Sequence, residues 1–136
     1  MKTVRVVAAI LRKDDRIFAA RRAAGKWSGF WEFPGGKTEP GETDREALVR
    51  EIREELNVEI GIDALYETVE YDYPSFHLSM QCFLGRIESG SPALNVHSDA
   101  KWMSLDEIDS AVWLPANRTL LEKIKREFPK TVFGTG

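Results

Sequence analysis

The chain has 136 residues, with hydrophobic and charged fractions that are ordinary for a soluble globular protein. A chain of this length buries roughly two-thirds of its unfolded surface, so we expect one domain over residues 1–136. The formal net charge of −3 argues against broad binding to a nucleic-acid backbone. No apolar run approaches the ~18 residues that span a membrane, and the N-terminus lacks a signal-peptide pattern. We therefore expect a cytoplasmic protein, in which the single Cys82 is a packing residue.

Two apolar, β-branched segments open the chain. Residues 4–11 predict a largely buried strand, and residues 16–20 predict a second strand that returns after a turn at residues 14–15. Residues 23–29 predict a loop. Residues 31–33 predict a short extended segment, because the residue before a proline avoids the helical region.

A well-specified helix follows. Thr43 and Glu46 form a capping-box pattern, so the helix is expected to begin at about Asp44. Asn57 is a suitable left-handed stop, since asparagine is the usual second choice after glycine there. An apolar stripe on this helix can pack on a core. The stripe consists of Leu48, Val49, Ile52 and Leu56.

The second half of the chain predicts further strands and two more helices. Residues 66–73 and 76–87 read as strands separated by Pro74, and residues 101–103 as a short third strand. Paired strands around one central helix, followed by more strands and a terminal helix, predict an α/β sandwich.

The C-terminal region carries a second capping box, formed by Ser104 and Glu107, which predicts a short helix over residues 105–110. A last helix is expected at about residues 118–128, and residues 131–136 are expected to be a frayed tail.

Acidic side chains gather around the central helix. Glu39 and Glu42 lie in the glycine- and proline-rich turn before it, and Glu51, Glu54 and Glu55 fall at i, i+3, i+4 spacing. That spacing projects the last three as one stripe about 100° wide. Mg²⁺ takes oxygen ligands and favours a few carboxylates together with substrate phosphates. The pattern thus predicts a metal platform for a phosphate ester or anhydride; the alternative is a solvated acidic face.

This stretch resembles the signature of the Nudix hydrolase family. The signature is Gly, five residues, Glu, seven residues, then Arg-Glu-aliphatic-x-Glu-Glu-x-Gly-aliphatic. The matching positions are Gly36, Glu42, Arg50, Glu51, Ile52, Glu54, Glu55 and Val58. Asn57 replaces the usual glycine, and its tolerance of positive φ should preserve the site. The resemblance implies the Nudix fold, an α/β/α sandwich with a mixed β-sheet and a catalytic loop-helix-loop.

Further segments resemble the MutT branch of that family, which cleaves nucleoside triphosphates. These segments start at Arg21, Trp31, Glu70, Trp102 and Leu114, in that order, and the similarity spans roughly residues 3–128. The resemblance implies Mg²⁺-dependent hydrolysis of a nucleoside triphosphate to the monophosphate and pyrophosphate, with Mn²⁺ as a possible substitute. Oxidised or non-standard nucleotides, of the 8-oxo-dGTP or CTP/5-methyl-dCTP type, are the expected substrates.

The resemblance also implies roles for the residues of the signature. Glu51, Glu54 and Glu55 bind the metal, with the Gly35 carbonyl as a further ligand. Arg50 is expected to pair with Glu42 and fix the loop on the helix; a phosphate contact is the alternative role. Gly36 belongs to the structural frame of the loop.

One position departs from many relatives, which carry a further glutamate before the strand at Trp102. Val96 occupies that position and cannot bind a metal. His97 or Asp99 can substitute for it, but each is expected to be a surface loop residue. The general base is therefore expected within the helix, at Glu51 or Glu54.

Other residues are expected to contact the substrate. Arg21 and Lys37 are expected to face the phosphates, and Phe33 and Tyr73 to flank the base. The MutT resemblance implies that Asn117 reads the base edge, because its amide offers a donor and an acceptor. The alternative for Asn117 is the N-cap of the last helix.

Three functions compete at this stage. The first is the triphosphate pyrophosphohydrolase described above. The second is a Nudix hydrolase of another nucleoside diphosphate derivative, such as ADP-ribose, NADH or a dinucleoside polyphosphate. The third is a non-catalytic Nudix-fold binding module, against which the complete set of helix acids argues. We expect a monomer or homodimer that binds neither a nucleic-acid polymer nor a membrane.

Overall fold

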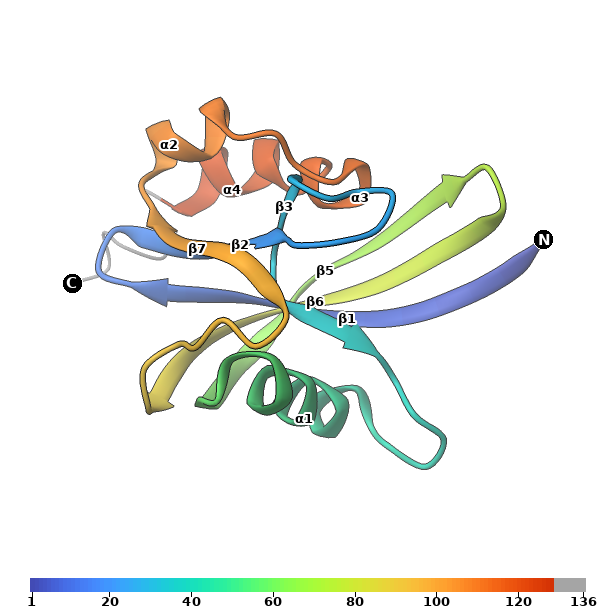
Figure 1. Cartoon of the computed structure of the whole chain (residues 1–136), viewed down its shortest axis with the longest axis horizontal. Coiled ribbons are helices and arrows are strands. Elements are labelled where there is room, and N and C mark those ends of the chain that lie inside the picture. The colour runs from blue at the N-terminus through green and yellow to red at the C-terminus, as the bar shows by residue number, and fades with distance from the viewer. Residues whose placement is uncertain (129–136) are drawn as a thin grey trace.

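The computed structural model describes residues 1–128, and the frayed tail expected at 131–136 lies outside the described residues. Helices cover both faces of one mixed β-sheet (Figure 1). The sheet contains β1 Lys2–Lys13, β2 Arg16–Arg22, β3 Trp31–Glu32, β4 Gly35–Lys37, β5 Glu59–Tyr73, β6 Phe76–Ser89 and β7 His97–Met103.

The central strand of the sheet is β1. It runs parallel to β6 on one side, and its other side pairs antiparallel with β4 and then with β2. The order along the sheet is β3-β2-β1-β6-β5, with β7 antiparallel to β2. This arrangement brings the start of β7 beside the end of β2, although about 75 residues separate them in the chain.

The helices lie in two layers. On one face of the sheet lies α1, Asp44–Leu56; the other face carries α2 Leu105–Ser110, α3 Pro115–Arg118 and α4 Leu121–Glu127 (Figure 1). Within residues 1–128, no helix combines the length and the apolar character needed to cross a bilayer.

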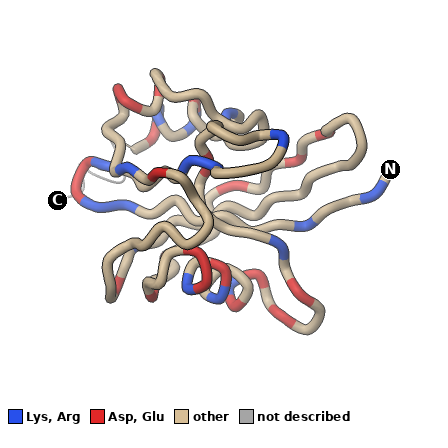
Figure 2. Tube along the Cα trace, in the orientation of Figure 1, with Lys and Arg blue, Asp and Glu red and all other residues tan. Residues whose placement is uncertain are grey.

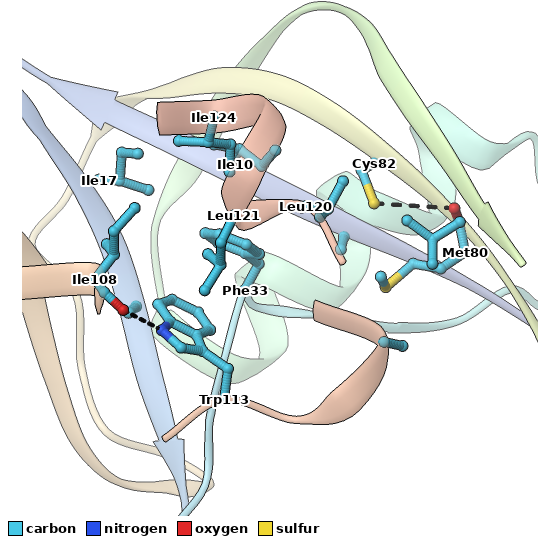
Figure 3. Close-up of a cluster of buried hydrophobic side chains, with 14 of the residues drawn as sticks. Ile10, Ile17, Phe33, Met80, Cys82, Ile108, Trp113, Leu120, Leu121 and Ile124 are labelled. Atoms are coloured by element: carbon cyan, nitrogen blue, oxygen red, sulfur yellow. Dashed lines mark hydrogen bonds between the residues drawn. The ribbon is translucent and has the colours of Figure 1, made fainter. Parts of the chain in front are cut away.

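Alternation along β1 supplies both layers with a core. Val7 and Leu11 face the cluster under α1, whereas Ala8 and Ile10 face the cluster under the C-terminal helices. In the second cluster the Trp113 ring lies among aliphatic side chains and donates its Nε1–H to the Ile108 carbonyl, 2.8 Å away (Figure 3). The expected α/β/α sandwich with a mixed sheet is therefore confirmed.

The predicted limits of α1 are confirmed. Thr43 and Glu46 form the reciprocal capping box, and the helix begins at Asp44. Asn57 adopts the left-handed conformation at φ 59° and ends the helix. The predicted apolar stripe faces the sheet, where Leu48, Ile52 and Leu56 are fully buried.

Four expectations about the elements were incomplete. The strand expected at 66–73 begins at Glu59, because register shifts against β6 break the alternation of its first half. Residues 35–37 form a strand that was not expected and that pairs with β1. The strand expected at 101–103 begins at His97. The last helix is split into α3 and α4, since Thr119 and Leu120 interrupt it.

Candidate active site

The acidic helix and the loop before it form one cluster of charges (Figure 2). Arg50 lies at its centre. Its Nε donates to Glu42 Oε2 at 2.6 Å, and its Nη2 donates to Glu42 Oε1 at 3.0 Å and to the Lys37 carbonyl at 3.1 Å. The guanidinium therefore fastens the loop to the helix from two sides.

The same guanidinium also contacts the helix acids. Its Nη1 lies 3.0 Å from Glu51 Oε1 and 3.2 Å from Glu54 Oε1. Its hydrogen bond lowers the pKa of Glu42, and the hydrogen bond to Glu42 raises the pKa of Arg50. Arg50 is thus always charged and compensates a group of carboxylates that would otherwise repel one another.

Gly36 allows the Glu51 carboxylate to approach the loop. A Cβ on this glycine would collide with the carboxylate of Glu51, so any larger residue would displace it. Burial raises the pKa of Glu51 even though Arg50 opposes the shift.

Glu55 is the most strongly perturbed acid of the cluster. Burial raises its pKa to about 8, and the charges of Glu32 and Glu51 act in the same direction, while the Gly35 backbone N–H opposes them. Its Oε1 atom is buried and has no hydrogen-bond partner among residues 1–128. A carboxylate in this state is suited to a cation that the protein itself does not supply.

The donors fit a hard divalent cation. In the described part of the chain, no three His, Cys, Asp or Glu side chains already converge as ligands of one ion. The acids present are nevertheless oxygen donors of the type Mg²⁺ favours, and the buried Glu55 Oε1 lacks a partner. Glu51, Glu54 and Glu55 would hold such an ion.

A cleft of about 330 Å³, here called the main cleft, begins at Glu55. Most of the predicted site residues line it: Phe33, Gly35, Gly36, Lys37, Glu55, Tyr73 and Asn117. Its remaining wall is mostly apolar and includes Val6, Trp27 and Leu78. A larger cavity of about 640 Å³ among α2, α3 and α4 includes none of the predicted site residues in its lining.

The aromatic walls of the main cleft are held from behind. Phe33 packs on the Trp113 ring with centroids 4.8 Å apart (Figure 3), and Tyr73 stacks on Phe76 at 5.0 Å. The Tyr73 hydroxyl accepts the Ala116 backbone N–H at 3.3 Å. These rings are therefore fixed before any ligand arrives.

Asn117 lies inside α3, not at the start of a helix. The N-caps of α3 and α4 are Leu114 and Leu120, so the alternative role of Asn117 as a cap is wrong. Its Oδ1 accepts the Phe33 backbone N–H at 2.9 Å. This bond fixes the amide and leaves its Nδ2 as a donor at a cleft that is otherwise mostly apolar.

The structure does not bring Arg21 to the main cleft. Arg21 donates to Ser98 Oγ at 3.0 Å and lies over the Trp31 ring at 5.8 Å. Its neighbour Arg22 lines the cleft and pairs with Glu32 at 3.2 Å. Successive residues of a strand face opposite sides, and that alternation is the signal that separates the two arginines.

A second cavity, here called the side cavity, has a volume of about 310 Å³ and shares Arg22, Glu32 and Glu55 with the main cleft. His97 lines it and is only 7% exposed, with Nε2 3.0 Å from Glu32 Oε2. The expectation that His97 is a surface loop residue is therefore wrong, because β7 begins there and pairs with β2. Asp99 is exposed, as expected, but it lies in β7 and not in a loop.

Comparisons with known proteins agree with this arrangement. The family model described as the NUDIX domain matches residues 6–123, so the chain belongs to the Nudix family. Within that family it is MutT-like. It is 35% identical over 128 residues to the 8-oxo-dGTP diphosphatase of Escherichia coli K12, covering 93% of this chain and 99% of that protein.

Two further comparisons point to the same branch. The chain is 35% identical over 123 residues to the CTP pyrophosphohydrolase of Escherichia coli K12, covering 90% of this chain and 91% of that protein. The crystal structure of a MutT NUDIX hydrolase from Burkholderia pseudomallei matches with a TM-score of 0.83 and 26% identity. That match covers 91% of this chain and 99% of the other.

Proposed function

We propose that this chain is a nucleoside triphosphate pyrophosphohydrolase that depends on a divalent cation, Mg²⁺ or in its place Mn²⁺. It releases a nucleoside monophosphate and pyrophosphate, and it removes oxidised or non-standard nucleotides of the 8-oxo-dGTP or CTP/5-methyl-dCTP type. The observation that carries the proposal is the position of Glu55, where the acidic cluster opens into an aromatic-walled cleft. We further propose a cytoplasmic enzyme that acts as a monomer or homodimer.

The main cleft has the properties of a nucleobase pocket. Phe33 and Tyr73 offer fixed aromatic walls, and an apolar lining with few polar groups is typical of small-molecule sites. The Asn117 Nδ2 donor supports recognition of an acceptor on the base edge. Lys37 lines the cleft, which supports a phosphate contact, and Arg22 lines it together with Glu55.

The helix acids account for the chemistry. A divalent cation supplies charge neutralisation on the phosphates and activation of water. Glu51, Glu54 and Glu55 would hold it, and Gly35 lines the main cleft together with Glu55. Arg50 keeps the loop against the helix through Glu42, so the acids and the Gly35–Lys37 segment keep a constant separation.

A substrate panel in Mg²⁺ with chromatographic separation of the products tests the proposal. The panel contains ordinary, oxidised and methylated triphosphates together with ADP-ribose, NADH and a dinucleoside polyphosphate. We expect a triphosphate to be the best substrate, with pyrophosphate and monophosphate as products. A preference for a diphosphate derivative would replace the proposed substrate class, and no turnover of any compound would indicate a binding module.

Metal dependence is tested in the same assay. We expect no measurable turnover in excess EDTA and recovery on addition of Mg²⁺ or Mn²⁺, because a site of carboxylates without a cation lacks the positive charge that stabilises cleavage of a triphosphate. Full activity in EDTA would contradict the assignment of the three helix acids to a metal.

A further inference from the structure

Buried polar atoms without a partner are concentrated at the side cavity. Within residues 1–128, four buried side-chain nitrogen or oxygen atoms have no hydrogen-bond partner. Three of them belong to residues that line this one cavity: Arg22 Nε, Glu55 Oε1 and His97 Nδ1. Unsatisfied polar atoms are rare in folded proteins, so three around one space indicate a polar species that occupies it.

The orientation of His97 determines what that species is. The side chain is 3% exposed, and its Nε2 lies 3.0 Å from Glu32 Oε2. The other Glu32 oxygen accepts from Arg22 Nη1 at 3.2 Å, which holds the carboxylate in place. Because a carboxylate accepts hydrogen bonds, Nε2 carries the proton, and in the neutral ring Nδ1 keeps its lone pair.

A lone pair on Nδ1 requires a donor. The non-bridging oxygens of an ionised phosphate only accept hydrogen bonds, so they do not satisfy this atom. Water donates, and a space of about 310 Å³ with several polar walls is large enough to hold it. Glu55 belongs to both cavities, so a water in the side cavity would lie beside this acid.

We propose that His97 is the general base of the reaction and that Glu32 is its positioning residue. The Nδ1 atom takes a proton from water while the water oxygen bonds to phosphorus. The phosphoanhydride P–O bond breaks, and its electron pair stays on the oxygen of the departing phosphate group. The histidine then returns its proton to solvent. The substrate identity rests on the proposed function, whereas the role of His97 rests on the side cavity.

The charged groups around His97 come from three other elements. Glu32 on β3 contacts its Nε2, Arg22 on β2 neutralises that carboxylate, and Glu55 on α1 lines the same cavity. This arrangement replaces the expectation of a base within the helix. Glu51 and Glu54 both accept from Arg50, whereas the Nδ1 atom of His97 has no partner in the described chain.

Removal of the ring with chemical rescue tests the role. In His97→Ala we expect kcat to fall by about 10²-fold or more, the range of a lost general base, with KM changed by less than about threefold. Added imidazole should raise the kcat of this variant at least about tenfold, because removal of the His97 ring leaves space in the side cavity that imidazole can occupy. The matched control is His77→Ala, which removes the other histidine of the chain, half-buried on the β5–β6 hairpin. It should keep wild-type turnover.

Turnover of His97→Ala close to wild type, or a loss that imidazole does not relieve, would overturn the proposal. A second measurement needs no variant and no substrate. Long-range ¹H–¹⁵N correlation spectra of the wild-type imidazoles should show the neutral His97 ring with its proton on Nε2. A proton on Nδ1 would refute the role. If the substrate panel finds another nucleoside diphosphate derivative, the variants are assayed on it, so failure of the two proposals is distinguishable.

Discussion

At the scale of one residue, the buried carboxylate of Glu55 lowers the free energy of unfolding of the protein. Its carboxyl group is largely removed from water and lies near the charges of Glu32 and Glu51, and its pKa rises to about 8. In the unfolded chain the value is about 4.5. Between these two values the folded protein binds more protons than the unfolded chain, so the free energy of unfolding falls as pH rises.

The consequence is measurable in EDTA. We expect Glu55→Gln to be more stable than the wild type at pH 8 by at least about 1 kcal/mol, a lower bound that corresponds to less than one unit of pKa shift. Near pH 4.5 the difference should disappear. Denaturant unfolding at both pH values measures it, and the exposed Glu39→Gln serves as control. Equal stabilities at pH 8 would show that Glu55 is well solvated.

Glu54 offers the clearest test of the metal platform. Its side chain is 60% exposed, so Glu54→Gln should fold normally. We expect kcat to fall at least about 10²-fold, because a carboxylate of the reacting centre is lost. The control is Glu39→Gln. The Glu39 carboxylate is 63% exposed and lies 3.7 Å from Arg50, a weak exposed ion pair, so this substitution should lower kcat only slightly. Normal turnover of Glu54→Gln would indicate a merely solvated residue.

Asn117 allows base choice to be changed without removing its contact to the loop. Asn117→Asp keeps an oxygen for the Phe33 N–H but replaces the Nδ2 donor with an acceptor. We expect discrimination among bases to change by about 1–3 kcal/mol, the value of a buried hydrogen bond gained or lost. Competition between triphosphates measures kcat/KM ratios. Unchanged ratios would remove Asn117 from base recognition.

At the scale of elements, the stability of α1 depends on how its C-terminal end is closed. Asn57 ends the helix at φ 59°, and its Oδ1 accepts from the Asn95 Nδ2, which also donates to the Glu54 carbonyl. Both Asn57→Gly and Asn57→Ala lose the Asn57 side chain, but only alanine is strained at this φ. We expect alanine to be less stable than glycine by about 1–2 kcal/mol. Thermal unfolding of the pair checks this value, and equal stabilities would contradict it.

Local chemistry explains which elements could be predicted. The starts of α1 and α2 followed from reciprocal capping boxes, which act within four residues. The first half of β5 was missed because register shifts against β6 disrupt its alternation, and β4 was missed because its three residues pair only with β1. Pairing partners far away in the chain decide such segments, and no local pattern reports them.

The same division applies to the site. The signature places the acids, the loop and Arg50 within one stretch of about 20 residues, so a sequence pattern can identify them. His97 and Arg22 come together only because β7 pairs with β2, with the two residues opposite each other. Neither residue has a local signal for this contact. Alternation along β2 could have separated Arg22 from Arg21.

At the scale of the whole molecule, the two helical layers contribute different parts of the site. The aromatic wall of the main cleft comes from β5, β6 and the segment before β4, and is supported by the C-terminal helices. The acids come from α1 on the opposite face of the sheet (Figure 1). The position of a base bound in the cleft therefore determines which phosphate group of the triphosphate lies next to the acids and the side cavity.

This geometry links base position to the phosphorus that is attacked. The resemblance to the MutT branch implies attack of water on the β-phosphorus, so hydrolysis in ¹⁸O-water should label pyrophosphate and leave the monophosphate unlabelled. Mass spectrometry of both products measures the label. Asn117→Asp should show the same distribution even where its base preference changes, because the distance between cleft and acids is set by the sheet and not by the base edge. Label in the monophosphate would place the attack at the α-phosphorus. It would mean that the α-phosphate, and not the β-phosphate, lies next to the acids when the base is bound in the cleft.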